Sequence, residues 1–540
     1  MSTTQRGYVG ALIDRLGHNY LGFPPERCSY TVTGVRIPIT DGDEEFELVA
    51  DVYKPVLPQD EQPAGTLLVR SPYGRGPMLS FGFARPYAAR GYVVLAVSSR
   101  GTFGSGSTFD PWRNEEHDGH AVVDWMRKQD WYTGSFGTLG ASYLGFVQWA
   151  LLKNPPSDMV AAVIQCAPHH FSKQMWGTGS LALEVIEWGE HVAHQEDSGL
   201  SHFLDAFKSK KRMRAVLDRT PLAESVKTHF NGSAPWLDYV VDHPDVANLH
   251  YEQMNASEAL ERADIPILLI SGWDDLFASQ SLEQYARLSE RKTNVAFTIG
   301  PWNHMQSGMD AKTGEQTFDW LQVHVAKRKT STRKAPVQYF VTGAQEWREG
   351  PTWPPPTKHQ TFYVHSESRL DSNVPASDEK SSSTFIFDPK TPTPTMGGNL
   401  LMGGGSANDT ALASRPDVLT FTTKPLEDNL EICGPITVEL SHSSDNPSVD
   451  LFVRISEVNA KGISHSVTDT YSRLPPRRDD QSITLQLRDC AHRFAKGSRV
   501  RFILAGASYP QYAMPLEKAT HTIHHGRNGP SKILLPAVVI

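Results

Sequence analysis

The sequence predicts a multidomain α/β protein in which a helical segment interrupts a mostly parallel sheet and a β domain follows. Strand-like and helix-like segments alternate over the first 170 residues, as expected of a parallel sheet covered by helices. This alternation breaks from about 171 to 260 and resumes afterwards. Beyond about residue 333, helical periodicity largely disappears and short alternating strands take over. A chain of 540 residues is too long for one compact core, so two or three domains are expected.

The segments of the first region can be assigned in chain order. Buried strands are expected at residues 65–70, 92–97, 135–139, 160–164, 265–270 and 295–299. Helices are expected at 121–126, from the spacing of its apolar residues, and at 146–152. Residues 171–260 are rich in charge, histidine and tryptophan, which indicates helices. Their position between predicted strands makes them an insertion that caps the sheet.

The C-terminal region is predicted to consist mainly of strands and loops. Candidate strands lie at residues 436–440, 451–455, 484–487 and 500–504. Loops rich in proline and glycine, such as 389–405, separate the strands of this region. Several short strands at this spacing predict a β-sandwich or jelly roll.

Composition and charge exclude several classes of partner. The net charge of −8 argues against a nucleic acid or an anionic membrane, because both require basic patches. The sequence has no apolar run near the roughly 20 residues that span a bilayer, and its N-terminus lacks a secretory signal pattern. The remaining expectation is a small-molecule substrate, with a homo-oligomer left open.

The cysteines and histidines predict neither a metal site nor a disulfide framework. Cys28, Cys166, Cys433 and Cys490 are widely separated and form no Cys-x-x-Cys pair. Buried free thiols in a reducing, cytoplasmic compartment are therefore expected. The clusters His169-His170 and His521-x-x-His524-His525 lack companion ligands at zinc spacing. We expect no cofactor.

A serine lies where a strand gives way to a helix. Residues 140–145 read Gly-Ala-Ser-Tyr-Leu-Gly, directly after the predicted strand at 135–139. The small residues allow a tight turn that exposes the Ser142 hydroxyl, as in the nucleophile elbow of α/β-hydrolases. The second glycine of the common Gly-x-Ser-x-Gly pattern comes one residue late, at Gly145.

An acid and a base follow in the order that α/β-hydrolases use. Asp275 comes after the strand at 265–270, and His304 comes after the strand at 295–299. Side chains at the carboxyl ends of parallel strands face the crevice where α/β proteins bind ligands. A serine hydroxyl needs such a base, and the base needs an acid to orient it. Asp274 is the alternative acid.

Together these motifs resemble those of the CocE/NonD hydrolase family, which is related to cocaine esterase, α-amino acid ester hydrolases and X-Pro dipeptidyl peptidases of the S15 type. The family's Gly-x-Ser-Tyr-x-Gly elbow matches residues 140–145, which accounts for the displaced glycine. Its Gly-Trp-x-Asp-x-Phe motif matches 272–277 and favours Asp275 as the acid, and its Gly-Pro-Trp-x-His motif matches 300–304. Ser98 stands where the family usually has aspartate, which is expected to affect local packing.

The resemblance implies an architecture and a mechanism. It implies an α/β-hydrolase core at 1–170 and 261–332, a helical cap at 171–260 and a C-terminal jelly roll at 333–540. Ser142 would attack an acyl carbon, with His304 as base and Asp275 stabilising the imidazolium. The hydroxyl of Tyr73, in Arg-Ser-Pro-Tyr at 70–73, and the backbone N–H of Tyr143 would hold the oxyanion.

Substrate-binding residues are less sharply indicated. Trp176, Trp188 and Phe277 could line a pocket for a bulky acyl group or could equally pack in the core. A further set of acidic residues could bind a substrate ammonium or form a solvated helix face. This set is Glu184, Glu187, Glu190 and the pair Glu196–Asp197.

The predicted function is a serine hydrolase that cleaves an ester or amide bond through an acyl-enzyme. One alternative is an X-Pro dipeptidyl peptidase, which requires a free amine on its substrate. Another is a biosynthetic enzyme of the same fold that transfers the acyl group to another nucleophile or closes a ring. A non-enzymatic alternative is a carbohydrate-binding protein with a silent hydrolase domain, against which the intact triad residues argue.

Overall fold

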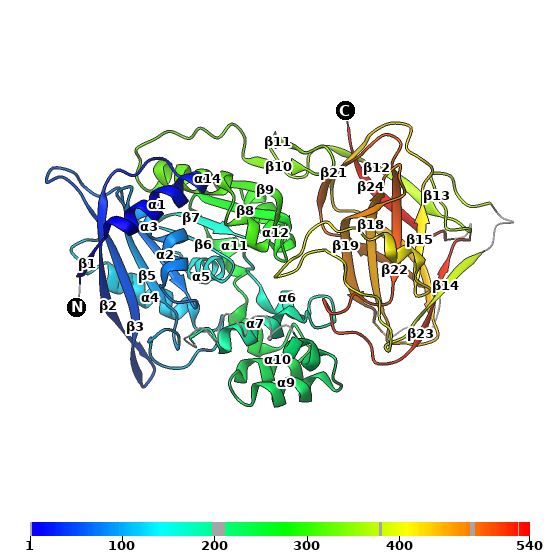
Figure 1. Ribbon diagram of the computed structural model, residues 1–540, viewed down its shortest axis with the longest axis horizontal. Helices are drawn as coiled ribbons and strands as arrows, with labels where there is room; N and C mark the ends of the chain where they lie inside the picture. The colour runs from blue at the N-terminus through cyan, green and yellow to red at the C-terminus, as the bar shows by residue number, and fades with distance from the viewer. Residues whose placement is uncertain (1–2, 197–210, 377–380, 476–480, 527–528, 540) are drawn as a thin grey trace.

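Figure 1 shows the computed structural model, which describes residues 3–196, 211–376, 381–475, 481–526 and 529–539. The described strands form three sheets: one of 11 strands in the first part of the chain, and two of nine and four strands in the last part. The α/β core and the C-terminal β-rich region confirm the predicted fold class.

The first sheet has a parallel centre and antiparallel edges, in the order β1-β2-β3-β5-β4-β6-β7-β8-β9-β10-β11. Each neighbouring pair from β5 to β10 is parallel, whereas β1 to β3 and β11 join antiparallel. Its strands are β1 (Thr3–Gln5), β2 (Ser29–Asp41), β3 (Glu44–Val56), β4 (Thr66–Ser71), β5 (Val93–Ser98), β6 (Phe136–Ala141), β7 (Met159–Gln165), β8 (Ile267–Asp274), β9 (Val295–Asn303), β10 (Val337–Val341) and β11 (Glu346–Gly350).

Helices cover both faces of this sheet, which explains why its central strands are continuous apolar runs. Alternate residues of β4 enter different cores: Leu68 belongs to the core that includes α4, α5 and α12, whereas Leu67 and Val69 belong to the core that includes α3 and α14. The helices of this half are α1 (Tyr8–Tyr20), α2 (Pro77–Phe83), α3 (Arg85–Ala88), α4 (Glu115–Met126), α5 (Tyr143–Leu152), α11 (Glu258–Arg262), α12 (Ala278–Glu290), α13 (His304–Ser307) and α14 (Ala311–His324).

The chain between β7 and β8 forms a helical layer, at the bottom of Figure 1 between the two halves. Its apolar side chains continue the core of the α5 face of the sheet. The described elements of this layer are α6 (Phe171–Trp176), α7 (Glu184–Ala193), α9 (Leu222–Phe230), α10 (Pro235–Asp242) and the 3-10 helix η1 (Leu249–Met254). Every described helix of the chain is too short or too polar to cross a lipid bilayer.

The last part of the chain is a β-sandwich, on the right in Figure 1. The nine-stranded sheet and the four-stranded sheet share one apolar core. The strands are β12 (Thr357–Val364), β13 (Leu370–Asp371), β14 (Ser382–Phe387), β15 (Val418–Thr422), β16 (Leu430–Gly434), β17 (Thr437–Ser444), β18 (Asp450–Val458), β19 (Ser464–Arg473), β20 (Gln481–Gln486), β21 (Cys490–Phe494), β22 (Arg499–Ala505), β23 (Ala519–His524) and β24 (Lys532–Val538), with the 3-10 helix η2 (Thr410–Ser414) before β15.

Two features differ from the sequence-based expectation. The hydrolase sheet continues past residue 332, because β10 pairs with β9 and β11 pairs with β10. The long antiparallel hairpin of β2 and β3 and the N-terminal helix α1 were not predicted, and both belong to this half.

Candidate active site

Ser142 occupies a sharp turn between β6 and α5. Its φ of 59° and ψ of −124° place a non-glycine residue in a sparsely populated backbone region. Such strain persists only where the surrounding structure imposes it. Here the Ser142 N–H donates to the Gln165 carbonyl at 2.9 Å, and the Ser142 carbonyl accepts from Phe146 N at 3.1 Å. The turn therefore holds the hydroxyl at the carboxyl end of the sheet.

Two glycines make this turn sterically possible. A Cβ on Gly140 would lie 2.4 Å from Leu144 Cβ, and a Cβ on Gly145 would lie 2.3 Å from Ala167 Cβ. Gly145 thus lets α5 lie directly against the chain that leaves β7. Leu144, at the position of the common second glycine, is buried in the opposite core. The displaced glycine of the elbow therefore has a packing reason.

The three predicted triad residues lie together. His304 Nε2 is 3.0 Å from Ser142 Oγ, and His304 Nδ1 is 3.0 Å from Asp275 Oδ1. Asp275 is fully buried beyond β8, and the same carboxylate oxygen accepts from Phe277 N at 2.9 Å. His304 is the first residue of α13, directly after β9. This is the geometry of a hydroxyl, a base and an orienting acid.

Asp274 points away from this arrangement. Burial raises the pKa of its carboxyl to about 6, and the charges nearest to it are those of Arg488 and Asp469 in the β-sandwich. The carboxylate in contact with His304 is therefore that of Asp275.

Tyr73 approaches the serine from the loop after β4. Its hydroxyl oxygen accepts a hydrogen bond from Trp188 Nε1 at 3.0 Å and interacts with the Ser142 side chain. Burial raises the pKa of Tyr73 to about 12, so the phenol keeps its proton at neutral pH. Tyr143 is the first residue of α5, where backbone N–H groups have no partner within the helix.

A buried network fixes the side chain of Tyr143. Its hydroxyl donates to Glu115 Oε1 at 2.8 Å and accepts from Trp112 N at 2.8 Å. Glu115 Oε2 in turn accepts from Arg70 Nη2 at 2.6 Å. Sequence reasoning missed Glu115 and Trp112, because both lie outside the motifs that surround the three triad residues.

The Ser142 side chain opens into a pocket with an aromatic lining. The cavity also reaches Leu401, from the β-sandwich half, and Glu184, at the start of α7. Its aromatic lining consists of Tyr73, Trp112, Tyr143, Phe171, Trp188 and Phe277.

Two family models together match most of the chain. Residues 41–306 match the X-Pro dipeptidyl-peptidase (S15 family) model, and residues 329–535 match the model of the X-Pro dipeptidyl-peptidase C-terminal non-catalytic domain. Cocaine esterase from Rhodococcus sp. (strain MB1 Bresler) is 25% identical over 582 residues, which covers 94% of this chain and 99% of that protein. The chain belongs to the CocE/NonD hydrolase family. Its class of activity is that of a serine hydrolase.

Solved structures agree with this membership at the level of the fold. An aminopeptidase from the marine sediment archaeon Thaumarchaeota archaeon superposes with a TM-score of 0.80 at 19% identity, covering 94% of this chain and 97% of that one. An α-amino acid ester hydrolase superposes with a TM-score of 0.78, also at 19% identity and with the same coverages.

One of the three predicted substrate-binding residues lies elsewhere in this CocE/NonD hydrolase. Trp188 and Phe277 line the cavity, but Trp176 is not part of its lining. The Trp176 indole N–H donates to the Val240 carbonyl at 3.2 Å, so this side chain packs against α10. Trp176 ends α6, whereas Met175, one residue earlier, faces the cavity.

Glu184 is the one acidic residue of the predicted ammonium set that lines the cavity. Burial raises the pKa of its carboxyl to about 7, although Gln174 and the Leu401 N–H hydrogen-bond to it. Glu190 instead pairs with Arg212 and His229, and Glu196 accepts from Phe103 N. Asp197 lies outside the described residues.

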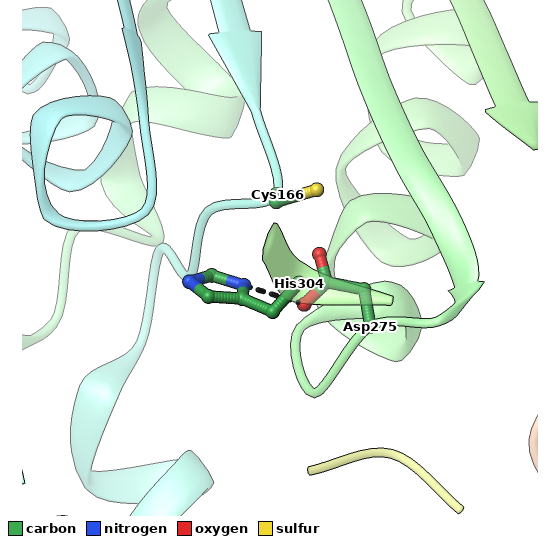
Figure 2. Close-up of side chains that lie close together, drawn as sticks. All are labelled: Cys166, Asp275 and His304. Carbon is green, nitrogen blue, oxygen red and sulfur yellow. Dashed lines mark hydrogen bonds and ion pairs between the residues drawn. The ribbon is translucent and has the colours of Figure 1, made fainter. Parts of the chain in front are cut away.

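Figure 2 shows Cys166 close to the acid Asp275 and the base His304. The Cys166 thiol, the Asp275 carboxylate and the His304 imidazole are groups of the kind that bind metal ions, and their nearest such atoms lie within 4.8 Å of one another. The Cys166 thiol lies 2.7 Å from Ser307 Oγ, and burial with the nearby Asp275 charge raises its pKa well above the usual value. Both ring nitrogens of His304 already contact Ser142 and Asp275, so we do not interpret the three groups as a metal site. We interpret Cys166 as a neutral thiol that packs against the acid.

The histidine clusters take part in local hydrogen bonds. His521 Nδ1 lies 3.1 Å from His442 Nε2, and His524 Nε2 lies 3.0 Å from Ser443 Oγ. His169 Nδ1 lies 3.2 Å from Gln284 Nε2.

Proposed function

We propose that the chain hydrolyses a small ester with a compact apolar or aromatic acyl group, with Ser142 as nucleophile, His304 as general base and Asp275 as the orienting acid. The observation that carries the proposal is the unbroken contact from Ser142 Oγ through His304 to Asp275, 3.0 Å at each step, beside an aromatic cavity.

The first half-reaction forms an acyl-enzyme. The Ser142 oxygen attacks the acyl carbon while His304 Nε2 takes its proton, and the carbonyl oxygen becomes an oxyanion. The imidazolium then donates its proton to the leaving alcohol as the bond to the acyl carbon breaks. Water, activated by the same imidazole, releases the acid and restores Ser142.

The oxyanion would be held by the hydroxyl of Tyr73 and the backbone N–H of Tyr143. The Tyr73 oxygen accepts from Trp188, so its own hydrogen would turn from the Ser142 side chain to the reacting carbonyl. Each such donor stabilises the transition state by about 2.7–4 kcal/mol. Glu115 and Trp112 would act as positioning residues, because they hold the tyrosine from which the second donor comes.

The acyl group would occupy the cavity between Phe171, Trp188 and Phe277. Aromatic walls bury apolar surface and present ring faces to an aromatic group. A small ester or amide is therefore the proposed substrate. A cytoplasmic location stays a prediction from the cysteine pattern.

A second candidate is an amine-bearing substrate, as an X-Pro dipeptidyl peptidase would require. Glu184 favours it, because this carboxyl is the acidic group that faces the cavity. In its charged form the carboxylate could pair with a substrate ammonium.

Labelling with a fluorophosphonate probe tests the nucleophile. We expect the wild-type chain to react at Ser142 and Ser142→Ala to lose both labelling and p-nitrophenyl ester turnover, with unchanged thermal unfolding. Ser414→Ala, which alters an exposed serine of η2, serves as the matched control. Turnover by Ser142→Ala at the wild-type rate would contradict the proposal.

A substrate panel tests the acyl preference. Aromatic esters, amino-acid esters and Ala-Pro amides should be ranked by kcat/KM, and we expect neutral aromatic esters to lead. A lead of Ala-Pro amides would favour the second candidate. Product analysis with an added amine separates hydrolysis from acyl transfer to another nucleophile.

A further inference from the structure

Helix α1 carries polar residues inward and apolar residues outward. Asp14 and His18 are fully buried in its inner face. The described part of the chain exposes 17 large hydrophobic side chains, and six of them lie on the 13 residues of this helix. These six are Tyr8 (98% exposed), Val9 (73%), Leu12 (60%), Ile13 (55%), Leu16 (68%) and Tyr20 (79%).

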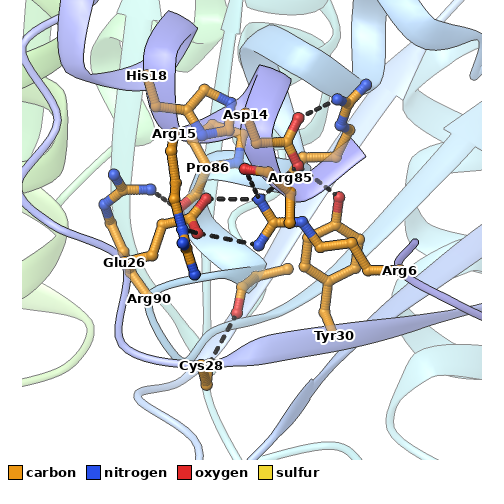
Figure 3. A network of polar contacts seen from close by, with 12 residues as sticks. Arg6, Asp14, Arg15, His18, Glu26, Cys28, Tyr30, Arg85, Pro86 and Arg90 are labelled. Carbon is orange, nitrogen blue, oxygen red and sulfur yellow. Dashed lines mark hydrogen bonds and ion pairs between the residues drawn. The ribbon is translucent and has the colours of Figure 1, made fainter. Parts of the chain in front are cut away.

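A hydrogen-bonded network fixes the inner face of α1, as Figure 3 shows. Asp14 Oδ2 accepts a hydrogen bond from Tyr30 Oη and forms an ion pair with Arg6 Nη2, both at 2.9 Å, and Oδ1 accepts from Arg85. His18 Nε2 lies 3.1 Å from the Phe81 carbonyl, and burial lowers the pKa of its imidazole to about 4. A rotation of α1 that buried its leucines would leave the Asp14 charge without these partners, which is strongly unfavourable. The outward direction of the apolar face is therefore imposed by the fold.

The exposed apolar face of α1 is large enough to indicate a surface that binds another molecule. Surface helices normally bury their apolar stripe, and contiguous exposed apolar patches mark interaction sites. We propose that α1 is the contact of a twofold-symmetric homodimer, in which its outer face packs against the same face of a second copy of this chain. The inference does not rest on the proposed catalytic function.

The spacing of the outer side chains suits packing against an identical helix. Tyr8, Leu12, Leu16 and Tyr20 recur every four residues and form one continuous ridge along α1. Val9 and Ile13 begin a second ridge beside it, with a groove between the two. Ridges spaced by four residues interdigitate with one another at a crossing angle of about −50°. A twofold axis makes each helix supply both the ridge and the groove.

The available area is consistent with a modest dimer. The two tyrosines, at about 150–250 Å² each, supply roughly 300–500 Å² per copy, and the four aliphatic side chains add further apolar surface. A standard interface buries about 800 Å² per partner. The exposed edge strand β1 precedes α1 directly and can supply part of the difference.

Charge favours a second copy over a membrane surface. Arg15 is the one charged side chain on the outer face of α1, and its Nε already donates to Glu26 Oε2 at 3.1 Å. Helices that lie on membranes carry many Lys and Arg residues on their polar face. Here the polar face points inward, and the chain has a net charge of −8.

Sedimentation velocity on the full chain from about 5 to 200 µM tests the proposal. The variant Leu12→Glu/Leu16→Glu places two charges on the ridge. The matched control Leu249→Glu/Leu516→Glu places two charges on exposed leucines of η1 and of the C-terminal half. Thermal unfolding checks the folding of both. Ester turnover is a second check, because α1 contributes no residue to the described cavity lining.

We expect the wild type and the control to reach twice the monomer mass of 59.9 kDa at the upper concentrations. The ridge variant should stay monomeric, with dimerisation weakened by roughly 100-fold or more. Leu16→Cys should form a disulfide-linked dimer on mild oxidation, whereas Leu249→Cys should not. A monomeric wild type at 200 µM would overturn the proposal, as would a ridge variant that dimerises like the control. A monomeric wild type that sediments with phosphatidylserine vesicles would assign the face to a membrane instead.

Discussion

Replacement of Glu184 by glutamine should remove a pH dependence from substrate binding. Burial raises the pKa of the Glu184 carboxyl to about 7, so its neutral fraction falls from about 90% at pH 6 to about 10% at pH 8. An apolar acyl group that enters the cavity strips water from this carboxyl and therefore binds to its neutral form. For a neutral aromatic ester, KM should rise by up to about ninefold between these pH values, which is about 1.3 kcal/mol.

The assay compares KM for a slowly hydrolysed aromatic ester from pH 5.5 to 8.5, so that KM approximates the dissociation constant. Glu184→Gln keeps an oxygen that can accept from Gln174 and the Leu401 N–H, and its KM should be level across the range. Glu224→Gln, which alters an exposed glutamate of α9, is the control and should follow the wild type. A wild-type KM that is level, or that falls as the pH rises, would refute the reasoning.

The same carboxyl should affect stability in a defined pH window. Because the pKa is higher in the folded than in the unfolded chain, this group favours folding most when protonated. That contribution is fully present below the ordinary value of 4.5 and is lost as the pH rises through about 7. The Tm of Glu184→Gln minus the Tm of the wild type should therefore be larger at pH 8 than at pH 4.5. A pH-independent difference in Tm would count against the raised pKa.

Three further substitutions probe the groups around the triad. Tyr73→Phe should lower kcat by about 10²–10³ and change KM little, because it removes one oxyanion donor; an unchanged kcat in steady-state assays would remove Tyr73 from the site. Cys166→Ala should lower kcat roughly fivefold at constant KM, because Asp275 loses its hydrogen-bonding contact with the thiol. Cys166→Ser should restore kcat, since a hydroxyl keeps that contact; equal losses in both variants would indicate packing alone. Glu115→Ala should lower the free energy of unfolding by about 3–5 kcal/mol in a denaturant titration, because it leaves the buried Arg70 guanidinium without its carboxylate; a loss below about 1 kcal/mol would show that Arg70 finds another partner.

The central strands could be predicted from the sequence because helices bury both of their faces. Each is a short apolar run bounded by turn residues, as at 65–70 and 92–97, and these match β4 and β5 to within a residue at each end. The hairpin of β2 and β3 has one face partly exposed, so apolar and polar residues alternate and no apolar run marks it. In helix α1 the apolar residues do not face the core, so its apolar pattern does not indicate which face of the helix is buried.

The residues of the candidate site likewise include some that the sequence predicts and some that it does not. Ser142, Asp275 and His304 each follow a strand of the parallel sheet, so chain order and strand position together predict that they converge. Trp176 and Trp188 are both buried or partly buried aromatics on helices, and sequence spacing does not reveal which of them faces the cavity. Leu401 lies in a loop more than 200 residues from Glu184, and no local pattern links the two.

That loop bears on what the C-terminal half contributes to the site. The side-chain amide of Asn399 donates to the Trp273 carbonyl at 3.0 Å and to the Asp275 carbonyl at 2.6 Å, so it holds the backbone that presents the triad acid. Leu401, two residues later, lines the cavity and donates its N–H to Glu184. Such contacts with the backbone of Asp275 are not expected of a separate binding module that is only linked to the hydrolase half. The β-sandwich half is thus a structural part of the candidate active site, because its Asn399 and Leu401 contact the loop that carries Asp275 and the cavity beside Ser142.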